Sequence, residues 1–304
     1  MPSEPEIRLS VALVTRNRPD SLEICLESWH AQTVRPFEIV VSDDSDDENA
    51  AKSEELARRY DCRYVRGPRR GLYANRNSAT RACKGSHILS ADDDHSHPAD
   101  YVEKVVECIR KDPKRVWIFA ERLDERDLAR PLVCPPELHR SGHGQSPADP
   151  SNCAAIADGA SVYPREIFDS GLWYDETYRF GPLWYLWGKV LVKHGWRISF
   201  SDSTFVWHRA WTESRLDDAA ALKKQLECMT YVLFVNAFWL NPGPVNLFWS
   251  LAYLIRRMLI PDSIVFYTVR SRLGVDSAAR ALYLTLTYPF RMSELSRKGS
   301  SRDD

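Results

Sequence analysis

Hydrophobic and polar residues form two alternating kinds of segment along the first 120 residues. Short apolar runs of strand length are separated by longer stretches in which apolar residues recur every three or four positions, the spacing of a helix face. One such stretch places Leu22, Cys25, Leu26 and Trp29 on one side and has a proline near its start. We expect strands at 8–15, 37–42, 62–67, 87–91 and 115–121, and helices at 17–32, 49–60, 71–85 and 98–112.

This alternation predicts an α/β fold with a mainly parallel sheet that is covered by helices on both faces. In such sheets, ligands bind at the carboxyl ends of the strands. Three polar clusters directly follow predicted strands, namely Thr15–Arg18, Asp43–Asp44 and Asp92–Asp94. Because the carboxyl ends of parallel strands lie at the same edge of a sheet, we expect these clusters to form one site.

The chain after residue 121 changes in character. Residues 122–155 are rich in Pro, Arg, His and Ser, which predicts a long loop or insertion, and residues 158–200 are unusually rich in aromatic side chains. The last ninety residues are helical in pattern. Their apolar pieces, 229–240 and 245–260, are separated by Asn-Pro-Gly-Pro, and each is shorter than the roughly 20 residues that a membrane-spanning helix needs.

The C-terminal region is also basic. Between Arg256 and Lys298 there are eight Lys or Arg residues and three Asp or Glu residues, close to Phe, Trp and Tyr. Basic charge beside aromatic residues is typical of a helix that lies on an anionic membrane surface. Simple packing of these helices on the main domain is an equal alternative. We therefore expect a domain of residues 1–210 followed by a helical extension of residues 211–304.

Composition narrows the class of protein. The 304 residues are 44% hydrophobic and 27% charged, as in an ordinary globular protein, and a net charge of −1 argues against nucleic-acid binding through bulk basicity. The seven cysteines include no Cys-x-x-Cys pair, which favours reduced thiols. The N-terminus has no apolar signal segment. These features predict a cytoplasmic protein, at the inner face of the cell membrane if its C-terminal helices contact lipid.

The stretch ILSADDDHSHP contains three adjacent aspartates at the end of a predicted strand. Carboxylates that lie side by side repel one another, so they are usually either exposed to solvent or bound to a cation. Hard divalent cations prefer carboxylate oxygens. His95 and His97 follow at a spacing that could also hold a metal, although they are the weaker candidates.

The motifs SVALVTRNRP, EIVVSDD, ANRNSATRACKG, ILSADDD, WYDE and VWH, in this order, resemble a bacterial family 2 glycosyltransferase of the GT-A fold. The resemblance covers roughly residues 8–210. It implies an inverting, metal-dependent enzyme that transfers a sugar from a UDP- or dTDP-sugar. The acceptor would be a glycan, a lipid-linked molecule or a small molecule, and the cofactor Mn²⁺ or Mg²⁺. The chain departs from the family pattern at Val14, Arg16 and Ser45, where proline, tyrosine and glycine are usual.

The resemblance assigns roles to residues that match the family's motifs. Asp92 would meet the ribose or the metal, Asp94 would bind the metal directly, and Asp93 would point to the other side and serve the structure. The implied nucleotide-binding residues are Thr15, Asn17, Asp43, Asp44, Arg76 and Asp92. The implied metal ligands are Asp92, Asp94 and His208. From the residues alone, Thr15 and Asn17 are equally good helix caps, and Arg76 is more typical of a surface residue.

The catalytic base is the largest departure from the family. Asp175 and Glu176 match the family's Asp-Glu element and are the assigned catalytic candidates, but Leu183–Trp184 occupy the later position where a Glu-Asp pair should supply the base. Another acid such as Asp158 would then act as the base, or the acceptor would need little help from a base. A third alternative is a catalytically silent protein that binds nucleotide-sugar. A nucleotidyltransferase is less favoured because no glycine-rich, lysine-bearing loop lies near the N-terminus.

The aromatic residues near this position have two interpretations. They could stack on the sugar faces of an acceptor, or they could belong to the hydrophobic core, and we favour the core for most of them. These residues are Trp173, Tyr174, Trp184, Tyr185 and Trp187.

Overall fold

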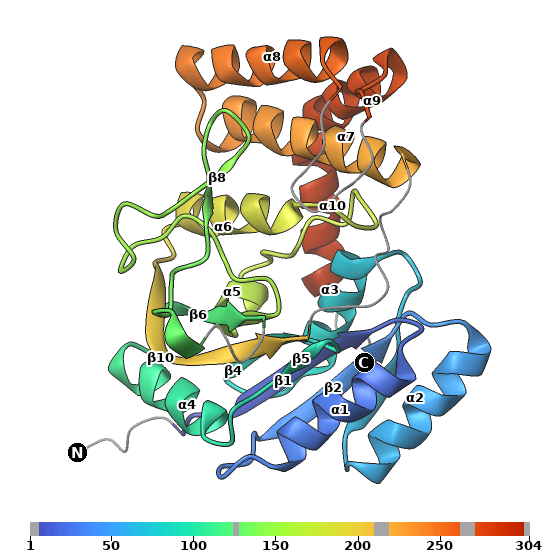
Figure 1. Ribbon diagram of the computed structural model, residues 1–304, viewed down its shortest axis with the longest axis vertical. Coiled ribbons are helices and arrows are strands. Elements are labelled where there is room, and N and C mark those ends of the chain that lie inside the picture. The colour runs from blue at the N-terminus through green and yellow to red at the C-terminus, as the bar shows by residue number, and fades with distance from the viewer. Residues whose placement is uncertain (1–5, 124–127, 210–218, 262–270, 301–304) are drawn as a thin grey trace.

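A computed structural model describes residues 6–123, 128–209, 219–261 and 271–300. An α/β layer lies at one end of the molecule and a group of helices lies at the other (Figure 1). The main sheet contains β1 (Leu9–Thr15), β2 (Glu38–Asp43), β3 (Arg63–Arg66), β4 (His87–Asp92), β5 (His95–Ser96), β6 (Val116–Arg122), β9 (Ala160–Pro164) and β10 (Ile198–His208). The helices of the α/β layer are α1 (Pro19–His30), α2 (Asp47–Arg59), α3 (Leu72–Ala82), α4 (Tyr101–Lys111) and the short α5 (Glu166–Asp169).

The eight strands are ordered β3-β2-β1-β4-β9-β6-β10-β5. All neighbouring pairs are parallel except those made by β9 and β5, so the predicted mainly parallel sheet is confirmed. Every residue of β1 is buried, because α1 covers one face of the sheet and α3 packs against β1 and β2 from the other. Buried strands with apolar side chains on both faces are typical of this architecture.

The five predicted strands and four predicted helices are present, with ends that differ by a few residues. The helix expected at 71–85 ends at Ala82, because the backbone of Cys83 is already extended. Three strands of the sheet were missed, namely β5, β9 and β10. β9 has no polar alternation and β10 contains a polar run with a register shift between Ser201 and Phe205, so neither shows a simple strand pattern. The expected loop at 122–155 carries a small hairpin, β7 (Glu137–Leu138) with β8 (Gly144–Gln145).

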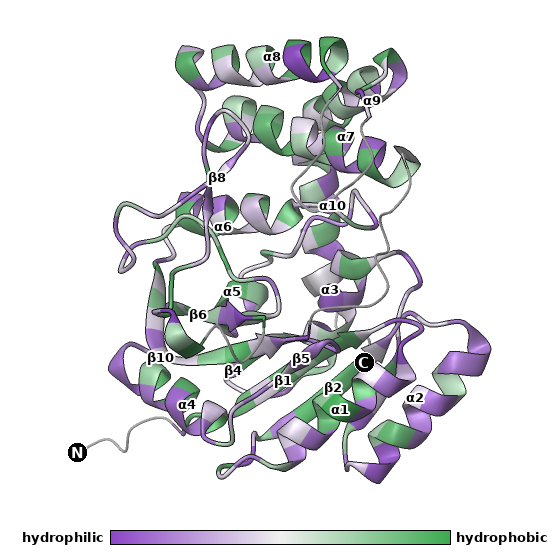
Figure 2. Cartoon of the chain, viewed as in Figure 1, coloured by the Kyte–Doolittle hydropathy of each residue, from purple (hydrophilic) through white to green (hydrophobic). Residues whose placement is uncertain are grey.

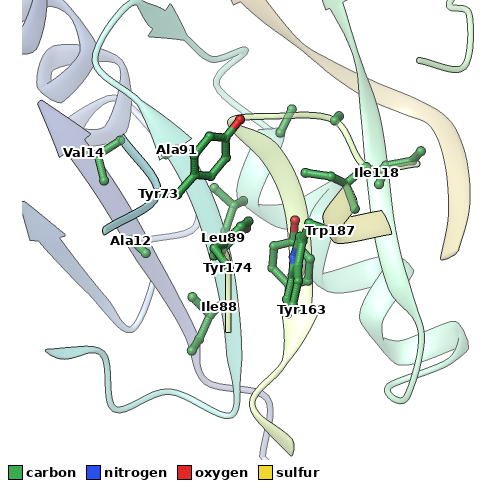
Figure 3. Close-up of a cluster of buried hydrophobic side chains, with 14 of the residues drawn as sticks. Ala12, Val14, Tyr73, Ile88, Leu89, Ala91, Ile118, Tyr163, Tyr174 and Trp187 are labelled. Carbon is green, nitrogen blue, oxygen red and sulfur yellow. The ribbon is translucent and has the colours of Figure 1, made fainter. Parts of the chain in front are cut away.

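The aromatic residues of the 158–200 segment mainly belong to the core, as predicted. Tyr163 of β9, Tyr174 and Trp187 are almost completely buried and lie together beside the central strands (Figure 3). The ring centroids of Tyr174 and Trp187 are 4.7 Å apart. Trp187 belongs to α6 (Leu183–Lys193), so this aromatic cluster attaches α6 to the sheet. Trp184 is only partly buried.

The C-terminal helices pack on α6 and on one another. They are α7 (Ala219–Val235), the π-helical turn η2 (Asn236–Leu240), α8 (Pro244–Leu259), α9 (Val275–Leu286) and α10 (Tyr288–Ser300). Tyr231 and Val232 of α7 join the main hydrophobic core, while Leu226, Phe234 and Leu254 contribute to a second, smaller cluster. The expected domain boundary at residue 210 falls in 210–218, outside the described residues. Among the helices described, none is both long and apolar enough to cross a bilayer.

Candidate active site

The aspartate run lies at the carboxyl end of β4, and a cross-strand pair brings two histidines to it. β5 and β10 pair antiparallel so that His95 faces His208, and their ring centroids are 4.8 Å apart. One possible ligand atom from each of Asp94, His95 and His208 lies within 4.8 Å of the others. In this group, the structure brings together two of the three predicted metal ligands, Asp94 and His208. It adds His95, which the spacing allowed as a metal ligand but which was the weaker candidate because the family does not usually use that position.

Several charges act on this group. Burial alone would raise the pKa of Asp94, but His95, His208 and Arg18 outweigh it and hold that pKa below its usual value. Arg18 donates a hydrogen bond to Asp94 Oδ2 at 2.7 Å. For His208, burial tends to lower the pKa. A contact of 3.1 Å between His208 Nδ1 and Glu121 Oε2 outweighs burial and raises this pKa above its usual value. Glu121 therefore orients the imidazole of His208 and leaves its Nε2 directed toward Asp94, 3.9 Å away.

Asp92 belongs to a different part of the site, centred on Arg76. The Arg76 side chain is only 1% exposed, so this residue of α3 is not on the surface, contrary to what its position on a helix alone favours. Its Nη2 lies 2.9 Å from Asp92 Oδ2 and 2.8 Å from Asp158 Oδ1, and its Nη1 donates to Ser90 Oγ at 2.7 Å. Burial raises the pKa of Asp158 to about 7 even though Arg76 lowers it. The Arg76 guanidinium therefore holds the carboxyl groups of Asp92 and Asp158 beside the possible metal site formed by Asp94, His95 and His208.

Gly159 permits this arrangement. Its φ is +76°, and a Cβ atom built there would lie 2.4 Å from Asp92 Oδ2 and 2.7 Å from His95 Cε1. An ordinary side chain would therefore be strained in its backbone conformation and would also displace both neighbours.

We expect Gly159→Ala to lower the free energy of unfolding by about 1–3 kcal/mol, the cost of a non-glycine residue held at positive φ. Urea titration measures this loss. The variant should also weaken metal-dependent nucleotide binding, because Asp92 and His95 must move. Gly195→Ala is the matched control, since Gly195 also has positive φ (+85°) but no atom lies within 4 Å of its built Cβ. If both variants retain the same nucleotide affinity, the close approach at Gly159 has no role in the site.

Thr15 and Asn17 hold the ends of neighbouring strands together and do not cap α1. Thr15 Oγ1 donates to Asp93 Oδ2 at 2.7 Å. The Asn17 backbone N–H donates to Ser45 Oγ, and its side-chain oxygen accepts from the N–H of Asp46. The helix begins after Arg18, and no side chain caps it. The alternative role of Thr15 and Asn17 as helix caps is therefore wrong.

Asp93 points into the protein, in agreement with its expected structural role. Burial and the adjacent charge of Asp94 raise the pKa of the Asp93 carboxyl to about 7. Its backbone oxygen accepts hydrogen bonds from Ser21 and Arg209. Asp93 therefore fixes the path of the chain between Asp92 and Asp94.

Asp43 and Asp44 are both buried at the end of β2. Asp43 Oδ1 accepts from the N–H of Ser45 at 2.8 Å, and Asp43 Oδ2 accepts from the Tyr64 hydroxyl at 3.0 Å. Asp44 accepts from the backbone N–H groups of Arg69 and Gly71. These bonds shape the loop that follows β3. The Asp43 side chain is completely buried, so a nucleobase could reach it only if neighbouring groups moved.

Asp175 and Glu176 lie among contacts that attach other elements. Asp175 accepts hydrogen bonds from Thr177 and from the hydroxyl of Tyr231 in α7, and Arg291 of α10 is 3.6 Å from its Oδ1. Its side chain is only 6% exposed. The structure therefore places Asp175 between two C-terminal helices.

Glu176 is likewise paired within the chain. It accepts from Asn77 Nδ2 at 2.9 Å, and its other oxygen lies 2.8 Å from Arg70 Nη2. Leu183 and Trp184, which stand where the family has Glu-Asp, begin α6, and Leu183 is buried while Trp184 is partly buried. Of the three acids considered as a base, Asp158 is the one that shares a partner with Asp92.

Sequence reasoning missed several residues of this site. Arg209 contacts the aspartate run, and Glu121 supports His208. Arg18 was expected at the site as part of the cluster Thr15–Arg18, but its bond to Asp94 was not. Glu121 lies near the end of β6, so its position at the carboxyl ends of the strands was the available signal. Arg209 follows the VWH motif directly.

Comparisons with known proteins agree with this architecture. A family model described as glycosyl transferase family 2 matches residues 10–172, more than half of the chain. An uncharacterized glycosyltransferase of Haemophilus influenzae is 28% identical over 112 residues, which make up 36% of this chain and 37% of that protein. The match thus spans little more than a third of the length of that relative.

Solved structures show the same fold. S. aureus TarS 1–349 in complex with UDP superposes with a TM-score of 0.58 at 12% identity, over 97% of this chain and 90% of that one. GalNAc-T7 with UDP, GalNAc and Mn²⁺ superposes with a TM-score of 0.60 at 17% identity, over 82% of this chain and 54% of that one. The expected GT-A fold is therefore confirmed. On the family match over more than half of its length, the chain belongs to glycosyl transferase family 2.

Proposed function

We propose that this protein is a metal-dependent, inverting glycosyltransferase that uses a UDP- or dTDP-sugar as donor. The observation that carries the proposal is the pair of adjoining groups at the strand ends, Asp94–His95–His208 and Arg76–Asp92–Asp158. Family membership supports glycosyl transfer. The UDP and UDP-GlcNAc complexes of TarS, and the UDP and Mn²⁺ complex of GalNAc-T7, support the donor and the metal.

The donor set of Asp94, His95 and His208 fits a divalent cation. One carboxylate and two imidazoles leave positions for phosphate oxygens and water, and imidazole ligands favour Mn²⁺ over Mg²⁺. When bound there, the cation would offset the negative charge of the departing diphosphate. Glu121 keeps His208 in the orientation this requires by accepting from its Nδ1–H.

In this proposal, the nucleotide lies along the ends of β1, β2 and β4. The Asn17 backbone and the Asp43–Asp44 region form the wall beside the base, and Asp92 meets the ribose or the metal. Arg76 holds Asp92 in place and contributes positive charge to the floor of the site. Thr15 acts through Asp93, which it fixes by a hydrogen bond.

The acceptor is proposed to be a glycan, a lipid-linked molecule or a small molecule. Among the acids considered for the base, we favour Asp158, because Arg76 orients one of its oxygens and the side chain remains 21% exposed. Asp175 and Glu176 would have to release the partners described above to act as a base. The second candidate function is a silent nucleotide-sugar-binding protein, which the replacement of the family's Glu-Asp pair by Leu183–Trp184 favours.

Contact with an anionic membrane surface is also part of the proposal. The basic and aromatic C-terminal helices support it. Such contact would suit a lipid-linked acceptor at the inner face of the cell membrane.

Calorimetric titration tests the donor site. We expect UDP or dTDP to bind in the presence of Mn²⁺, with an affinity at least about tenfold lower after chelation, because the phosphates and the protein share the ion. The better ligand identifies the base. A subsequent transfer assay with wild-type protein and Asp158→Asn separates the two functions. Binding without transfer to any acceptor supports the silent protein, and the absence of binding by either nucleotide contradicts both functions.

A further inference from the structure

One helix of the C-terminal group exposes an apolar face to solvent. In α8, Val245, Phe248, Ile255 and Leu259 are 52%, 63%, 56% and 67% exposed. They recur at intervals of three, seven and four residues, so they lie on one side of the helix. Figure 2 shows α8 mainly in green and pale shades, and Figure 1 places it at the end of the molecule farthest from α1 and α2.

The opposite side of α8 attaches it to the protein. Ser250, Tyr253 and Leu254 are buried, and Ser250 Oγ donates to the backbone oxygen of Leu233 in α7. The side of α8 that packs against the protein is therefore already occupied, and the exposed apolar residues form a separate, outward-facing side of the helix. A surface helix normally has polar residues on its solvent side, and contiguous exposed apolar residues mark an interaction surface.

Charge identifies the partner of this face. α8 contains no Asp or Glu, and its last turn contains the exposed Arg256, while the neighbouring Arg257 stacks over Tyr253 on the attached side. The N–H of Leu273 bonds to the Arg257 backbone oxygen, which brings the exposed Arg272 to the same end. An apolar helix face bordered by basic residues is complementary to acyl chains bordered by anionic lipid headgroups.

A second copy of the chain fits this face less well. In a two-fold contact each α8 would meet the same surface of its partner, and α8 offers no carboxylate to pair with the arginines of the other copy. We propose that α8 is the membrane-docking element of this protein, lying in the interface of an anionic bilayer with Phe248, Ile255 and Leu259 inserted among the lipids. The inference deepens the membrane contact in the proposed function and is independent of the donor chemistry.

Co-sedimentation with large unilamellar vesicles tests the proposal. Wild-type protein should pellet with vesicles of 30% phosphatidylglycerol in phosphatidylcholine and bind several-fold less to pure phosphatidylcholine. The double variant Phe248→Asp/Ile255→Asp should lower the partition coefficient by at least about a hundredfold, since two inserted side chains are lost. The matched control is Ile24→Asp, which replaces a 47% exposed residue of α1 and should bind vesicles like the wild type.

Two further measurements keep the result decisive. Circular dichroism and Mn²⁺-dependent UDP binding of each variant show that the fold and the donor site are intact, so failure of the donor proposal would be seen separately. If folded wild-type protein pellets with neither vesicle, the proposal is overturned. It is also overturned if light scattering shows a wild-type dimer that the α8 variant converts to a monomer, because the face would then join two copies.

Discussion

Asp94→Asn is expected to lower the Mn²⁺-dependent affinity for UDP by at least about a hundredfold. Loss of a residue that only supports a metal ligand typically costs 10–100-fold in metal affinity, and loss of the ligand itself should cost no less. Asp94 is the only carboxylate in the group with His95 and His208 among the described residues. Asparagine has nearly the same shape but no charge, so the change removes the electrostatic attraction for the cation. Calorimetric titration with UDP and Mn²⁺ measures the loss.

The adjacent Asp93 provides the matched control. Its carboxyl points into the protein and is not part of the group with His95 and His208, and asparagine keeps its shape and an oxygen that can accept from Thr15. Asp93→Asn should therefore keep its affinity for UDP and Mn²⁺ within about tenfold of the wild type. Equal losses in the two variants would show that the aspartate run acts through the local fold and would contradict a ligand role for Asp94.

Arg18 offsets part of the negative charge of the aspartate run when no metal ion is bound. Its guanidinium contacts the carboxylates of both Asp93 and Asp94 and donates a hydrogen bond to one oxygen of Asp94. This ion pair offsets part of the repulsion between adjacent carboxylates, which a metal ion would otherwise have to do. The triple aspartate is thus compensated by an internal cation as well as by any bound ion.

The sequence predicted the parts of the site that depend on a single strand. A buried apolar run followed by polar residues identifies the end of a strand, and so Asp43, Asp92 and Asp94 were correctly expected at the sheet edge. The pairing of His95 with His208 could not be predicted, because it depends on a two-residue strand that forms only against β10. Tertiary contacts, not local patterns, define such a short strand.

The contacts of Arg76 and Asp175 could not be predicted either, because their partners are also distant in sequence. Arg76 is buried because Asp158, which is distant in sequence, lies beside it where β9 enters the sheet. Asp175 matches a family motif, yet its partner Tyr231 belongs to a C-terminal helix beyond the region that the motif describes. A resemblance transfers the position of a residue but not the contacts made by segments outside the resemblance.

Arg76→Met is expected to destabilise the protein by about 3–5 kcal/mol near neutral pH, the usual cost of removing one partner from a buried ion pair. Methionine fills much of the arginine volume, so the loss comes mainly from leaving Asp92 and Asp158 without their common cation. Arg81→Met is the matched control on the same helix. Arg81 is exposed and stacks over Trp173 at 4.3 Å, so its loss should cost about 1 kcal/mol or less.

The pH dependence distinguishes a lost ion pair from a packing defect. Burial raises the pKa of Asp158 to about 7, well above that of an unfolded aspartate, so this group binds its proton more tightly in the folded protein. Its contribution to stability therefore falls as pH rises from about 4 toward 7, and removal of Arg76 must raise its folded pKa further. Urea unfolding should show a larger deficit for Arg76→Met at pH 8 than at pH 5, with no such difference for Arg81→Met. An equal deficit at both pH values would mean that Arg76 stabilises the fold through its packing rather than through the carboxylates.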